Sequence, residues 1–129
     1  VWELRFGNLP DGTEPIATER VKWDRAYQKK LGVTNRPADL PDDVAARVAR
    51  VARRSYRALA LTGYARLDLR LSEDGVLHVI EANPNPDLTD DEDFALAAAR
   101  SGLAYPQLIQ RILRLGIAYR APGRRTGKA

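Results

Sequence analysis

Two acidic residues on either side of a turn signal are the strongest candidates for chemistry in this sequence. Asp74-Gly75 is typical of a tight hairpin turn, and alternating apolar and polar residues flank it on both sides. If these two residues form the loop, Asp68 lies directly opposite Glu81, and Arg66 lies directly opposite Asn83. Directly opposed side chains share one face of a sheet, with Cβ atoms roughly 4.5–5.5 Å apart. The sequence therefore predicts two facing carboxylates beside an amide and a guanidinium group.

Facing carboxylates repel each other, so the strand pair needs a compensating group. One carboxylate could be protonated, an arginine (Arg66 or Arg70) could bridge the two, or a divalent cation could lie between them. Asn83 is a third oxygen donor on the same face, which favours the cation. A donor set of Asp, Glu and Asn suits Mg2+ or Mn2+, which bind through one or two carboxylates plus substrate phosphates. We therefore predict a metal site at Asp68, Glu81 and Asn83, with the arginine bridge as the alternative.

The single histidine is not expected to join this site. Because side chains alternate along a strand, His78 is expected on the face opposite to that of Glu81, and we interpret it as structural. The chain has no cysteine, which excludes a disulfide framework and thiolate metal sites and fits a cytoplasmic location.

The residues around the two acids resemble a known family. The runs GYARLD (residues 63–68) and VIEANPNP (residues 79–86) are similar to the C-terminal magnesium-binding segment of ATP-grasp ligases, in the D-alanine–D-alanine ligase branch. The segment AYPQLI (residues 104–109) also resembles that family's end, so the resemblance covers about residues 22–116. It implies an α+β fold, the C-terminal lobe of an ATP-grasp domain, with an antiparallel sheet covered by helices.

The resemblance also implies roles for single residues. Asp68, Glu81 and Asn83 match the family's magnesium ligands, which hold the metal ions that bridge ATP phosphates. Arg66 matches the arginine that stabilises the negative charge of the tetrahedral intermediate. A catalytic role for Arg66 and a metal site at the other three residues follow as expectations.

ATP and Mg2+ (or Mn2+) are the cofactors that the resemblance implies. Lys22 resembles the lysine that contacts ATP phosphates, Ile80 matches an apolar residue beside the adenine, and Glu81 is expected at both nucleotide and metal. The implied function is that of the ATP- and Mg-binding lobe of an ADP-forming carboxylate–amine ligase that works through an acyl phosphate. The family's N-terminal and central domains have no counterpart in this sequence, so we expect the chain alone to be inactive.

Two departures from the family pattern concern the acceptor. Asp87 stands where the pattern has a glycine, and the acidic run TDDED (residues 89–93) stands where the family has a serine that binds the acceptor's carboxylate. Both departures argue against a simple D-alanine acceptor. An ATP-grasp ligase for another amino acid or peptide is therefore one alternative, and a non-catalytic basic binding module is another.

Periodicity predicts the elements that position these residues. Strands are expected at residues 1–6, 64–71 and 76–81, helices at 22–31 and 41–61, and a linker at 36–40. Thr89 and Glu92 are expected to form a capping box for a helix that stops at Gly102. A last helix begins near Pro106 and is expected to turn four residues inward: Leu108, Ile109, Ile112 and Leu113.

The composition is that of one small globular domain, with 129 residues, 44% of them hydrophobic and 29% charged. No apolar run is long enough to cross a membrane, and the first residues lack a signal-peptide pattern. The formal net charge is +4, and the chain starts at Val1 and lacks methionine, so we expect a piece of a longer protein.

The resemblance also divides the chain. Residues 1–118 are expected to form the ATP-grasp lobe and residues 119–129 a basic flexible tail. An arginine stripe on the 41–61 helix is interpreted as a solvent-exposed face rather than a nucleic-acid surface; it consists of Arg47, Arg50, Arg54 and Arg57. We expect ATP and small amino-acid or peptide substrates as partners, together with the family's other domains. No membrane partner is expected. The sequence does not decide whether the protein forms a homodimer.

Overall fold

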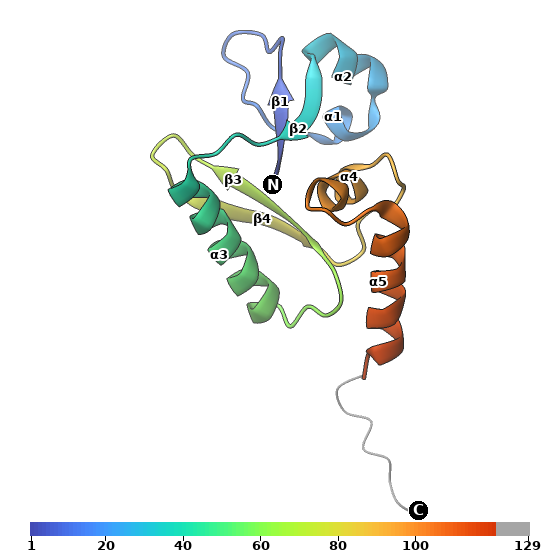
Figure 1. Cartoon of the computed structure of the whole chain (residues 1–129). Coiled ribbons are helices and arrows are strands. Elements are labelled where there is room, and N and C mark those ends of the chain that lie inside the picture. The colour runs from blue at the N-terminus through green and yellow to red at the C-terminus, as the bar shows by residue number, and fades with distance from the viewer. Residues whose placement is uncertain (121–129) are drawn as a thin grey trace, which may run out of the picture. The chain divides into compact units, whose positions relative to one another are not determined.

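The computed structural model describes residues 1–120. These residues form two compact units, and the boundary along the chain falls between Asp42 and Asp43. Figure 1 shows the helices and strands of both units. Of the basic tail expected at residues 119–129, only Tyr119 and Arg120 lie in the described part, and residues 121–129 lie outside it. No helix among the described residues is long and apolar enough to span a membrane.

The first unit is a two-stranded antiparallel sheet, and two short helices connect its strands along the chain. The strand β1 (Trp2–Phe6) pairs with β2 (Val33–Pro37), so that Trp2 lies opposite Pro37 and Phe6 opposite Val33. The strand predicted at residues 1–6 is confirmed. The linker predicted at residues 36–40 is wrong in its first part, because residues 36 and 37 belong to β2.

The helix predicted at residues 22–31 is two helices, α1 (Glu19–Trp23) and α2 (Arg25–Leu31). The break falls at Asp24, whose backbone is extended and whose carboxylate accepts a hydrogen bond from the Tyr27 amide at 2.9 Å. Asp24 therefore caps α2 instead of continuing α1. Trp23, the last residue of α1, is 80% exposed although it is apolar.

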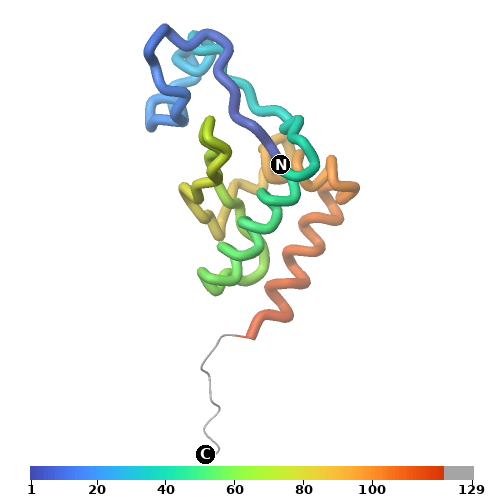
Figure 2. The backbone as a smooth tube through the Cα atoms, turned by 90° about the vertical axis from the view of Figure 1, so that its left-hand side faces the viewer, coloured from blue at the N-terminus to red at the C-terminus, as the bar shows by residue number. Residues whose placement is uncertain are grey.

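The second unit contains the predicted hairpin and three helices. The helix α3 (Asp42–Ala58) precedes β3 (Arg66–Leu71) and β4 (Leu77–Asn83), and α4 (Asp93–Arg100) and α5 (Tyr105–Ala118) follow. The three helices lie on the same side of the hairpin, as the two views together show (Figure 1, Figure 2). This arrangement agrees with the expected α+β lobe, an antiparallel sheet covered by helices.

Two expectations about helix ends and faces were wrong. Thr89 does not cap α4: its hydroxyl and its amide both donate to the Asp87 carboxylate, at 2.6 and 2.9 Å, and Glu92 precedes the helix without a capping hydrogen bond. Leu113 was expected inward but is 60% exposed, whereas Leu108 is buried. The stop at Gly102 is confirmed, since this residue has φ +84° and its amide donates to Ala99.

Few side chains are fully shielded from solvent. The buried residues within residues 1–120 are Val21 and Leu31 in the first unit and Val48, Pro86, Ala95 and Leu108 in the second. A ring contact between Tyr64 and Phe94, with centroids 5.7 Å apart, ties the segment before β3 to α4. The hairpin thus rests on a thin core and on its own strand pairing.

Candidate functional site

The hairpin brings the four predicted residues together in the predicted pairs. Asp68 lies opposite Glu81, and Arg66 lies opposite Asn83, in the antiparallel register of β3 and β4. Directly opposed residues of a strand pair share a face. Asp68 and Arg66 are two residues apart, so all four side chains belong to one face of the hairpin.

The loop that sets this register differs from the predicted one. Ser72 and Val76 close the loop through a backbone hydrogen bond of 2.9 Å, which leaves three loop residues instead of two. Gly75 has φ +80°, the left-handed conformation that such a loop requires at its last position. The Asp74 carboxylate accepts hydrogen bonds from the Ser72 hydroxyl and the Val76 amide, and these bonds lower the pKa of Asp74.

A bulge restores the predicted pairs. Near the loop, Leu69 lies opposite Val79, but the next residue of β3, Asp68, lies opposite Glu81. Ile80 therefore has no partner on β3 and is the extra residue of a β-bulge. The longer loop shifts the register by one residue, and Ile80 shifts it back before the carboxylate pair.

The same bulge corrects the expectation for His78. His78 lies opposite Arg70, which shares its face with Asp68 and hence with Glu81. The predicted alternation counted Ile80 as a regular strand residue and so placed His78 on the wrong face. The histidine still forms no metal cluster: within residues 1–120, no group of three or more His, Cys, Asp or Glu side chains is arranged to hold an ion.

Arg66 forms a bidentate ion pair with the Asp68 carboxylate. Its Nε donates to one carboxylate oxygen at 2.7 Å, and an Nη donates to the other at 3.0 Å. The hydrogen bond to Asp68 raises the pKa of Arg66, burial works in the opposite direction, and the charges of Asp68, Glu81 and Asp93 add to the rise. The arginine compensation that the sequence left open is therefore present for Asp68.

Asp93 is a member of this charge cluster that the sequence analysis missed. It is the first residue of α4, and its carboxylate acts on Arg66 electrostatically. The sequence assigned the acidic run to a helix start and gave no signal that this helix starts near the hairpin. Only the tertiary structure connects Asp93 with Arg66.

Asn83 ends β4 with its side chain folded onto the following turn. Its Oδ1 accepts a hydrogen bond from the Asn85 amide at 2.9 Å. A carbonyl oxygen has two lone pairs, so this bond leaves one for another donor or a cation. The turn leads to Pro86, which is buried.

Ile80 and Glu81 are both accessible at the bulge. Ile80 is 65% exposed, an unusual fraction for a strand residue of its size, and Glu81 is also exposed. An exposed apolar side chain beside a carboxylate could contact a flat apolar ligand while the acid faces a charged part of it.

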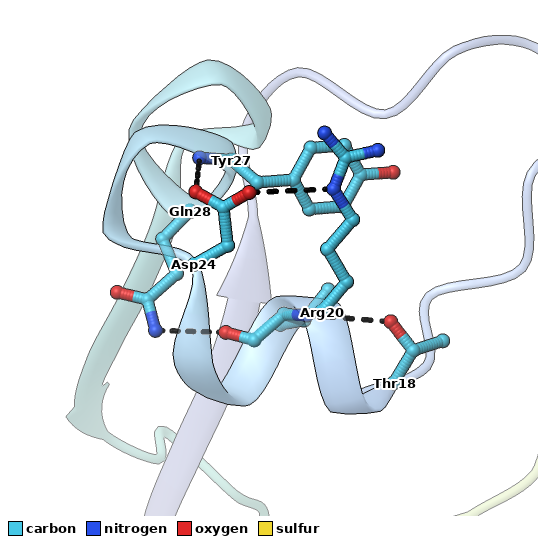
Figure 3. A network of polar contacts seen from close by, with 6 residues as sticks. Thr18, Arg20, Asp24, Tyr27 and Gln28 are labelled. Atoms are coloured by element: carbon cyan, nitrogen blue, oxygen red, sulfur yellow. Dashed lines mark hydrogen bonds and ion pairs between the residues drawn. The ribbon is translucent and has the colours of Figure 1, made fainter.

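Lys22 lies in the first unit, whereas the hairpin residues lie in the second. Its side chain is exposed, but its backbone is held firmly. Gln28 donates to the carbonyl oxygens of Val21 and Lys22, at 2.7 and 3.3 Å, and Thr18 caps the helix start (Figure 3).

The neighbours of Lys22 brace the same turn. Arg20 stacks over the Tyr27 ring at 4.1 Å and donates to the Asp24 carboxylate at 3.4 Å (Figure 3). The hydrogen bond from the Tyr27 amide is the largest cause of the lowered pKa of Asp24. The segment from Thr18 to Gln28 thus holds the backbone around Lys22 through capping and side-chain hydrogen bonds.

Thr89 holds the Asp87 carboxylate through two hydrogen bonds. The hydrogen bonds from the Thr89 hydroxyl and amide lower the pKa of Asp87, so the carboxylate is ionised at neutral pH. A negative charge therefore stands four residues beyond Asn83.

Comparisons with known proteins agree on one family. The family described as "D-ala D-ala ligase C-terminus" matches residues 16–114. D-alanine–D-alanine ligase A of Mesorhizobium japonicum is 40% identical over 110 residues, which are 85% of this chain and 30% of that protein. D-alanine–D-alanine ligase of Nitratidesulfovibrio vulgaris (strain DP4) is 42% identical over 81 residues, 63% of this chain and 27% of that protein.

A solved structure gives the same match. The crystal structure of D-alanine–D-alanine ligase from Bacillus anthracis complexed with ATP has a TM-score of 0.62 and 26% sequence identity. It matches 65% of this chain and 29% of the ligase chain. The chain thus spans about a third or less of the length of these relatives.

Proposed function

This chain belongs to the D-ala D-ala ligase C-terminus family, and we propose that it supplies the ATP- and Mg-binding lobe of an ADP-forming carboxylate–amine ligase. The reaction would phosphorylate a carboxylate with ATP and let an amine attack the acyl phosphate. Because the chain is a minor part of its relatives' length, catalysis would also need N-terminal and central domains. Such an enzyme would act on small amino acids or peptides in the cytoplasm.

The observation that carries this proposal is the pair of opposed carboxylates, Asp68 and Glu81, next to the Asn83 amide. Two carboxylates and an amide fit Mg2+ or Mn2+, which keep several water or substrate ligands, better than they fit an ion caged by protein alone. Arg66 does not block the site, because a carboxylate offers about four lone-pair positions and Arg66 uses two.

Each residue would have a distinct task. A divalent cation held by Asp68, Glu81 and Asn83 would neutralise charge on the ATP phosphates. Lys22 would contact ATP phosphates, and Ile80 would contact the adenine.

Arg66 would act in the second half of the reaction. Asp68 holds one edge of its guanidinium group, and the remaining N–H groups would donate to the oxyanion that forms when the amine attacks. Its raised pKa keeps the group cationic at every pH at which the enzyme would work. This is stabilisation by a charge that is oriented before the reaction starts.

Asp87 bears on which acceptor substrate the ligase would use. An ionised carboxylate close to the acceptor region would repel a carboxylate and attract an ammonium group. We therefore favour an acceptor other than simple D-alanine, such as another amino acid or a peptide with an additional cationic group.

Manganese binding tests the metal site without catalysis. Mn2+ is titrated into the whole chain and followed by electron paramagnetic resonance, for the native sequence, for D68N/E81Q and for E73Q/D91N. The control pair removes the same charge from two exposed positions, in the hairpin loop and in the acidic run. We expect D68N/E81Q to weaken binding by about tenfold or more and the control to change it little. Equal weakening in both variants would mean that Mn2+ is attracted by the net negative charge and not bound by Asp68 and Glu81, and it would contradict the metal site.

A further inference from the structure

A pocket lies between α3 and the loop end of the hairpin, at the opposite end from Arg66 and Asn83. Its volume is about 560 Å³, within the range of roughly 300–1,000 Å³ found for small-molecule sites. Six lining residues matter for the argument, three of them basic and three apolar: Arg47, Arg50, Arg54, Val51, Val76 and Leu77. The arginine stripe of α3 is thus not only a solvent-exposed face, because part of it lines this pocket.

The pocket carries more positive than negative charge. Arg47 donates a hydrogen bond to the Gly75 carbonyl and so stays beside the loop. Arg50 and Arg54 form no ion pair with any carboxylate of residues 1–120. Asp74 also lines the pocket, and its carboxylate is already bonded to Ser72 and Val76. Three guanidinium groups therefore face one carboxylate.

Within α3, no acidic residue lies three or four positions from Arg50 or Arg54. The residues three and four positions from Arg50 are Arg47, Ala46, Arg53 and Arg54. Like charges at these spacings destabilise a helix. An anion bound from solution would offset this repulsion. Without such an anion, replacing one of these arginines would stabilise the helix.

We propose that this pocket binds the phosphate of a small organic phosphate monoester. Arg50 and Arg54, one helical turn apart, donate to the phosphate oxygens, and the organic part contacts Val51, Val76 and Leu77. A phosphate monoester carries a charge of about −1.5 to −2 at neutral pH, which matches the excess of two positive charges in the lining. A carboxylate supplies one negative charge and leaves half of that excess unmatched.

This site is separate from the proposed metal site. The bulge and the strand pairs from Leu69 to Leu71 lie between the loop and Asp68. Binding needs no divalent cation, so the inference stands or fails independently of the ligase proposal.

Calorimetric titration of the whole chain with phenyl phosphate, in the presence of EDTA, tests the pocket. The variant R50Q/R54Q removes the two proposed ligands. R53Q/R57Q removes the same charge from the same helix at positions that do not line the pocket, and it serves as the control. Circular dichroism checks that both variants keep their helices.

We expect R50Q/R54Q to weaken phenyl phosphate binding by about tenfold or more, and R53Q/R57Q to change it by less than about threefold. Benzoate should bind more weakly than phenyl phosphate, and D68N/E81Q should bind phenyl phosphate like the native chain. Three results would overturn the proposal: no binding to the native chain, equal loss in both arginine variants, or tighter binding of a single-stranded oligonucleotide that both variants weaken equally.

Discussion

Arg66 and Asp68 form the best-defined interaction of the candidate site. The pair is bidentate, yet the side chains are 41% and 37% exposed. An ion pair this accessible contributes only about 0–1 kcal/mol to folding, so stability gives little reason for its geometry. Orientation gives a better one, because Asp68 fixes the plane of the guanidinium group and leaves its other edge for a ligand. A lysine at position 66 would keep the charge and lose that plane.

Asp87 yields a prediction at the same scale. In the whole ligase that we propose, Asp87→Gly should shift acceptor preference toward D-alanine by roughly tenfold, because the substitution removes a repelling charge. Acceptor panels with phosphate release as the readout measure this shift, with Asp90→Asn as a matched control in the same acidic stretch.

The pKa of Asp87 sets the pH dependence. Because hydrogen bonds from Thr89 lower that pKa, the carboxylate stays ionised from neutral to mildly acidic pH, and its selectivity should fade only as the pH falls through the lowered pKa. Efficient joining of two D-alanines by the native enzyme would contradict the acceptor proposal.

At the scale of elements, the hairpin shows what the sequence could and could not predict. The turn signal and the alternation predicted the pair of Asp68 and Glu81, which the structure confirms. They could not reveal the three-residue loop or the bulge at Ile80, because both depend on how one strand meets the other. The two errors cancel at the carboxylates but not at His78.

Other elements repeat this pattern. Local signals predicted β1, α3 and the end of α4 at Gly102, because caps and periodicity lie within each segment. The strand β2 was missed, since its polar sequence becomes a strand only by pairing with β1, far along the chain. The split between α1 and α2 depends on one capping side chain, Asp24, that outcompeted the helical pattern.

Two glycine substitutions test the loop assignment. Gly75→Ala should destabilise the chain by about 1 kcal/mol, because φ +80° is costly for alanine although no atom blocks its Cβ. Gly116→Ala should stabilise it by up to about 1 kcal/mol, because Gly116 lies in α5 with ordinary φ and open space around its Cβ. Urea unfolding measures both, and equal changes in the same direction would contradict the loop assignment.

At the scale of the whole molecule, the described chain buries little of its apolar surface. Large apolar side chains remain open, among them Trp23, Ile80 and Ile117, which are 65–80% exposed. The chain also matches only about 30% of the length of the Mesorhizobium ligase. Both facts support the proposal that further domains complete the enzyme and that the chain works as one lobe of it.

The central claim is that Asp68, Glu81 and Asn83 hold the divalent cation of an ATP-dependent ligase. The most direct measurement is Mg-ATP-dependent phosphate release, with a panel of amino acids, by a protein that joins this chain to the proposed N-terminal and central domains. We predict that Glu81→Gln lowers this release by about a hundredfold or more, while Glu73→Gln leaves it unchanged and both variants keep their fold by circular dichroism. Phosphate release by Glu81→Gln at the native rate would contradict the claim.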